Sequence, residues 1–87
     1  MPTYLLVREV GELTEEDMKA GFARAEEVGE QIPDVRWIRS YYSAAEGKLY
    51  CEYEAPSLEL LAEHAKKVGL PLDQATVVRN LEPSMFW

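Results

Sequence analysis

The chain has 87 residues, with nine Lys or Arg against sixteen Asp or Glu, so its formal net charge is −7. This balance argues against nucleic-acid binding, since affinity for phosphate backbones comes mainly from clustered positive charge, and it also disfavours an anionic membrane surface. The single cysteine cannot form an internal disulfide, and no apolar run approaches the ~20 residues of a membrane span. We therefore expect a cytoplasmic protein with no nucleic-acid or membrane partner and with one domain over residues 1–87.

The first part of the chain predicts a strand followed by a long helix. Residues 3–10 are rich in Tyr, Leu and Val, as is typical of a strand. Thr14 is expected to cap a helix over residues 15–31, because three carboxylates follow it at the positive end of the helix dipole. Apolar residues then recur every three or four positions, until Pro33 prevents the helix from continuing.

Residues 35–43 and 48–54 predict a β-hairpin, with a turn that contains Gly47. Successive side chains of a strand point to opposite faces of the sheet, so every second residue shares a face. This alternation predicts two same-face pairs: Trp37 with Tyr41, and Cys51 with Tyr53.

The last part of the chain predicts a second helix and a final strand. Ser57 is a suitable N-cap for a helix that ends before Gly69, a residue suited to the left-handed conformation that follows many helices. Residues 75–81 read as a strand, and residues 82–87 form an apolar C-terminal tail.

The resulting order, β-α-β-β-α-β, is that of a ferredoxin-like α+β fold, in which two helices cover one face of a four-stranded antiparallel sheet. The other face would be bare, yet several predicted strands carry apolar or aromatic residues on both faces. Bare apolar surface of this kind usually marks an interface. We therefore expect a homodimer that packs sheet to sheet or edge to edge, with the apolar tail on the partner or across a sheet edge.

Cys51 and His64, the only cysteine and the only histidine, are expected to lie close together. The strand advances about 14 Å from Cys51 to its end, and the helix returns about 10 Å from its start to His64. Three interpretations follow. The two residues can be core packing, they can be two ligands of a transition metal, or they can form a nucleophilic Cys–His pair. The last is disfavoured because no glycine-rich oxyanion loop accompanies them.

Aromatic residues suggest an alternative kind of site. Trp37, Tyr41 and Tyr53 can line a small-molecule pocket between the sheet and the helices. A small dimeric enzyme or binding module of the α+β-barrel type would use such a pocket, although aromatic residues at strand spacing are more often core.

Three segments, "VRWIRSYYS", "LYCEYEAP" and "EHAKKVGLPLD", resemble the small bacterial proteins grouped as domain of unknown function 4242, a family associated with nickel binding. The resemblance implies a ferredoxin-like fold, a dimer, and a site for nickel or another divalent metal at Cys51, Glu54 and His64. Alternation along the strand places Glu54 on the face opposite Cys51, so a bend before Pro56 would have to re-aim it. Our leading hypothesis is a non-catalytic metal-binding protein.

Overall fold

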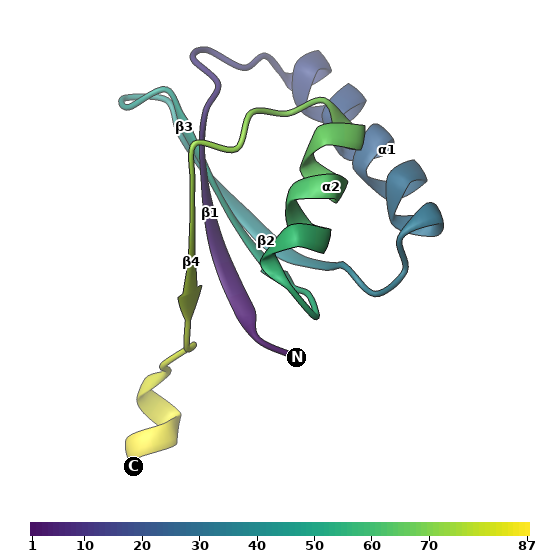
Figure 1. Ribbon diagram of the computed structural model, residues 1–87. Coiled ribbons are helices and arrows are strands. Elements are labelled where there is room, and N and C mark those ends of the chain that lie inside the picture. Colours follow the sequence, from purple (N-terminus) through teal and green to yellow (C-terminus); the bar gives the residue numbers. More distant parts are fainter.

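The computed structural model describes residues 1–87 and has the predicted ferredoxin-like order of elements (Figure 1). They are β1 (Thr3–Glu9), α1 (Glu15–Gln31), β2 (Arg36–Ser43), β3 (Lys48–Glu54), α2 (Leu58–Val68), β4 (Gln74–Val78) and a short 3-10 helix, η1 (Pro83–Phe86). The strands pair in the order β2-β3-β1-β4, and every neighbouring pair is antiparallel. Both α-helices lie on one face of the sheet, and no helix covers the other face (Figure 1).

Both α-helices are fixed at their ends by short-range hydrogen bonds. The Thr14 hydroxyl accepts a bond from the backbone N–H of Asp17, and the Asp17 carboxylate accepts one from the backbone N–H of Thr14. The Ser57 hydroxyl caps α2 by accepting a bond from the backbone N–H of Leu60, and Gly69 closes the helix with a φ of 83°. The predicted caps and helix bounds are therefore confirmed. None of the helices is long and apolar enough to cross a membrane.

The core lies between the sheet and α2 more than between the sheet and α1. Alternate residues of β1 and β3 are buried beneath the helices, and α2 adds four buried residues of its own. In contrast, Val28 is the one buried residue of the 17 in α1. Because α1 places so little side-chain volume on the sheet, the layer beneath it is incompletely filled.

A β-bulge in β2 corrects the predicted alternation. Trp37 lies opposite Tyr53, but Arg39 lies opposite Glu52, so β2 advances two residues where β3 advances one. The extra residue, Ile38, reverses the facing of every side chain that follows it.

The expectation that Trp37 and Tyr41 share a face is therefore wrong. Beyond the bulge, Ser40 lies opposite Cys51 on the helix-covered face, while Tyr41 lies opposite Tyr50 on the uncovered face. Strand alternation has a strict period of two, so one inserted residue is enough to exchange the two faces.

The C-terminal strand is shorter than predicted. Strand β4 ends at Val78, which pairs with Thr3 at the very start of β1, so residues 79–81 have no ladder partner. The tail then runs away from the sheet (Figure 1), and its apolar side chains from Leu81 to Trp87 are exposed. Its predicted packing across a sheet edge does not occur within the chain.

Candidate functional site

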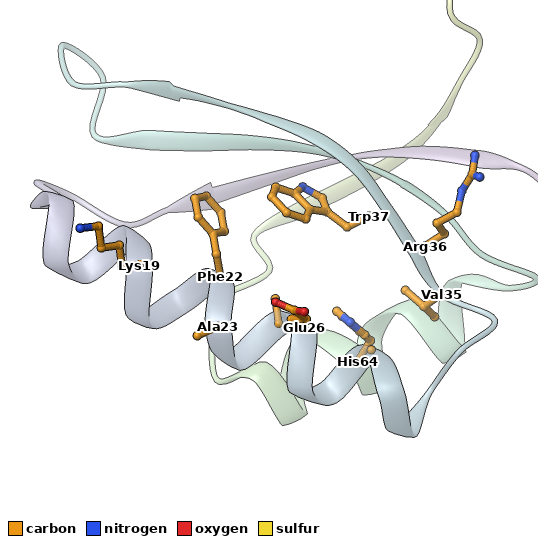
Figure 2. A pocket seen from close by; sticks show the side chains of 10 residues that line it. Lys19, Phe22, Ala23, Glu26, Val35, Arg36, Trp37 and His64 are labelled. Atoms are coloured by element: carbon orange, nitrogen blue, oxygen red, sulfur yellow. The ribbon is translucent and has the colours of Figure 1, made fainter.

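A cavity of about 620 Å³ opens between α1 and the beginning of β2 (Figure 2). It lies where α1 stands off the sheet. Phe22 and Glu26 reach it from α1, Trp37 from β2 and His64 from α2. Its walls are largely apolar, and a volume of this size is typical of small-molecule sites.

Two aromatic rings bridge α1 and β2 beside the cavity. Phe22 and Trp37 stack with their ring centroids 5.0 Å apart and their planes 20° from parallel. The Trp37 indole N–H donates to the Ser40 hydroxyl (2.9 Å), which in turn donates to Cys51 Sγ (3.0 Å). The bulge allows the bond between Trp37 and Ser40, because it places these two residues, three apart in β2, on the same face of the sheet. The Trp-x-x-Ser segment is therefore a structural device that fixes the orientation of Trp37.

His64 lies on the buried side of α2 and is part of the lining of the cavity. The residue is 2% exposed, and its Nδ1 atom has no hydrogen-bond partner. Its ring meets Tyr53 edge-on at a centroid distance of 5.4 Å. Burial, and then the positive charge of Arg8, lower the pKa of His64 below its usual 6.5. The imidazole is therefore neutral at pH 7, which is the form that accepts a proton or binds a metal.

Arg8 is a fully buried cation without a carboxylate partner. It lies on β1 beneath the helices, its Nη1 donates to the Pro71 carbonyl oxygen (3.0 Å), and its Nε has no partner. Burial raises the pKa of the nearby Tyr53, and the charge of Arg8 acts in the opposite direction. A buried guanidinium normally has a counter-ion, so its absence here is a feature to be explained. We did not predict the burial of Arg8 from the sequence, although alternation along β1 places it on the same face as Leu6.

The structure does not bring the three predicted metal ligands together. Cys51 and His64 both lie in the layer between sheet and helices, but Cys51 is bonded to Ser40, and His64 packs on Tyr53. Glu54 lies on the other face and pairs with Arg36. No group of three His, Cys, Asp or Glu side chains in the chain is arranged to hold a metal.

The three aromatic residues predicted to line a pocket have different locations. Trp37 lines the cavity; Tyr53 is buried and contacts His64; Tyr41 is 54% exposed on the opposite face. The contribution of α1 was missed, although Phe22 and Glu26 are four residues apart and therefore lie on one face of a helix.

These features define a small ferredoxin-like α+β protein with a half-open cavity under its first helix. Residues 4–78 match the family described as nickel responsive protein SCO4226-like, and the chain belongs to this family. The name of this family differs from domain of unknown function 4242, the family that the sequence resembles. Both families are associated with nickel. No curated protein matches the chain.

The fold is also similar to that of a solved bacterial structure. The crystal structure of SCO4226 from Streptomyces coelicolor A3(2) is 21% identical, with a TM-score of 0.79 over 92% of this chain and 99% of that chain. At this identity the likeness shows the fold alone.

Proposed function

We propose that this protein binds a divalent transition-metal ion, nickel first among them, through His64 and without catalysis. The observation that carries the proposal is the buried imidazole of His64 in the lining of an open cavity, with its Nδ1 atom lacking a hydrogen-bond partner. A neutral imidazole is a suitable ligand for nickel, and Glu26 lines the same cavity with a carboxylate that can add oxygen. The family's description as nickel responsive supports the choice of metal.

The side chains of one chain do not complete a nickel site by themselves. Only His64 and Glu26 offer donors of the usual kinds at the cavity, and no three-donor group exists. Cys51 and Glu54 are less suitable, because each already has another partner, Ser40 and Arg36 respectively. The remaining coordination positions would have to be filled by water or by groups that arrive with the metal.

Calorimetric titration of nickel and zinc into the metal-free protein tests this proposal. We expect His64→Ala to weaken nickel binding by at least about tenfold, since it removes the nitrogen ligand. Cys51→Ser serves as the matched control and should bind nickel like the unmodified protein. Circular dichroism should show that both variants are folded. Binding that survives His64→Ala, or no binding of the unmodified protein below millimolar nickel, would contradict the proposal.

A second candidate function is the binding of a small organic molecule, and the cavity itself favours it. Its volume of about 620 Å³ and the stacked Phe22–Trp37 pair suit a carbon skeleton better than a bare ion. In this alternative His64 and Glu26 would be the polar groups that orient the ligand.

We further propose that the protein is a cytoplasmic homodimer that packs through the uncovered face of the sheet. Leu5 and Val7 of β1 and Tyr50 of β3 lie on that face, and none of the three is fully buried within the chain. A second copy that covers them would add the buried apolar area that a chain of 87 residues has difficulty in providing alone.

A further inference from the structure

We propose that the cavity between α1 and β2 binds a flat, uncharged aromatic molecule that carries an N–H donor, such as an aromatic carboxamide. The inference rests on the second candidate function, the binding of a small organic molecule, and deepens it by assigning the chemical class of the ligand. It follows from three properties of the lining: its flat aromatic surface, its hydrogen-bond acceptors and its balanced charge.

The aromatic surface of the cavity is the first argument. Phe22 and Trp37 both belong to the lining and project into the space between α1 and β2 (Figure 2). Their rings stack nearly parallel, yet Trp37 is still 43% exposed. The bond from the indole to Ser40 holds this ring in place before any ligand arrives, so little conformational entropy is lost on binding. Aromatic rings pair favourably in offset stacks, which favours a flat aromatic ligand.

The hydrogen-bonding groups of the lining are the second argument. The Nδ1 atom of His64 is enclosed by protein, whereas Nε2 has neither a hydrogen-bond partner nor complete enclosure, so Nε2 is the ring nitrogen that a ligand can reach. Glu26 lines the same cavity and forms no ion pair within the chain. A carboxylate only accepts hydrogen bonds, and a neutral imidazole accepts at Nε2 when Nδ1 carries the proton. Both groups therefore suit a ligand that donates a hydrogen bond.

The balance of charge is the third argument. The lining contains one carboxylate, Glu26, and two cations, Lys19 and Arg36, of which Arg36 is paired with Glu54. The burial of His64 disfavours its protonated form. Lys19 therefore balances Glu26, and a charged ligand would upset this balance in a largely apolar site, where an unpaired charge is costly. An anion would in addition be repelled by the net charge of −7.

Four probes of nearly the same shape test the inference. The compound 2-naphthamide is uncharged and has N–H donors, and methyl 2-naphthoate is uncharged without them; 2-naphthoate is an anion and 2-naphthamidine a cation. Each is titrated into nitrogen-15-labelled Trp87→Phe protein, in which the indole N–H signal is that of Trp37 alone. We expect 2-naphthamide to shift this signal and to bind at least about tenfold tighter than either ion. It should bind about fivefold tighter than the ester, which lacks the donor.

Two glycines of α1 provide a matched pair of variants that locate the ligand. Gly29 lines the cavity and Gly21 does not, and a Cβ atom at either position would meet no other part of the chain within 4 Å. We expect Gly29→Leu to fill part of the cavity and to weaken binding of 2-naphthamide at least about tenfold, while Gly21→Leu leaves it unchanged. Both variants replace a helical glycine by a better helix former, so both should fold. Equal affinities of the two variants would place the ligand elsewhere and overturn the inference.

The remaining outcomes separate the inference from the function on which it rests. Tighter binding of 2-naphthoate or 2-naphthamidine would overturn the inference, because the site would then select an ion, while the binding of small organic molecules would stand. Equal binding of 2-naphthamide and the ester would overturn the requirement for an N–H donor, and with it the role of His64 and Glu26 as acceptors. If no probe shifts the Trp37 signal, the inference and the second candidate function are both wrong.

Discussion

At the scale of single residues, two buried polar groups of the chain have unmet hydrogen-bonding capacity. Arg8 has an unpaired Nε and no counter-ion, and His64 has an unpaired Nδ1. Buried polar atoms are nearly always paired, because leaving them unpaired costs the free energy of removing them from water. Of the two groups, only His64 lines the cavity, where a ligand could supply the missing partner.

This cost leads to a prediction about stability. Replacing a buried ion pair by apolar side chains of similar volume is often neutral or stabilising by about 1–4 kcal/mol, and a buried ion without a counter-ion has no ion-pair attraction to lose. We expect Arg8→Met to raise the free energy of unfolding by about 1–2 kcal/mol, after the loss of its bond to Pro71 is counted. Urea unfolding measures the change, and Arg79→Met, at an exposed position, is the control for lost charge. A loss of stability confined to Arg8→Met would show that Arg8 supports the fold.

At the scale of elements, α1 buries only Val28 in full, and it also contacts β2 through the stack of Phe22 on Trp37. The loose contact with the sheet makes room for the cavity. A helix with a fully buried face is stabilised mainly by its packing. Because α1 has little such packing, its stability depends more on the N-terminal cap. The bond from Thr14 to the Asp17 carboxylate lowers the pKa of Asp17 below its usual 3.8.

The cap predicts how α1 depends on pH. Because the pKa of Asp17 is lower in the folded chain, the unfolded chain binds the proton more readily. The contribution of Asp17 to stability is therefore complete above about pH 4 and is lost as the pH falls through the lowered value. We expect Asp17→Asn to lower the melting temperature at about pH 7 and to have a smaller effect at about pH 3, as followed by far-ultraviolet circular dichroism. Glu16→Gln, next to the cap but outside its bonds, should show no such convergence.

At the scale of the whole molecule, two apolar surfaces are left without a partner. One is the uncovered face of the sheet, with Leu5 and Val7 near its centre; the other is the tail, where Phe86 and Trp87 are 69% and 96% exposed. The tail lies outside the segment that matches the family, which ends at residue 78. Our proposal places the contact of a homodimer on the sheet, where Leu5 and Val7 lie on the central strand β1.

The two surfaces can be distinguished by sedimentation velocity. We expect the unmodified chain to sediment as a dimer and Leu5→Lys to sediment as a monomer, since a buried, unpaired lysine is strongly disfavoured in an apolar interface. Removal of residues 80–87 is the matched comparison, and it should leave the dimer intact. A monomer from the truncated chain together with a dimer from Leu5→Lys would assign the contact to the tail.

The amino-acid sequence by itself determined the elements and their order. Caps at Thr14 and Ser57, a stop at Pro33 and a left-handed Gly69 act over a few residues, so local pattern was sufficient to place both helices and, with them, the ferredoxin-like fold. The tertiary structure decided what the site contains. The bulge at Ile38, the gap under α1 and the missing counter-ion of Arg8 depend on how separate elements fit together. A local pattern does not carry that information. One extra residue in a strand exchanges the two faces of the sheet for all residues that follow. A cavity depends on the packing of side chains from elements that are far apart in the sequence.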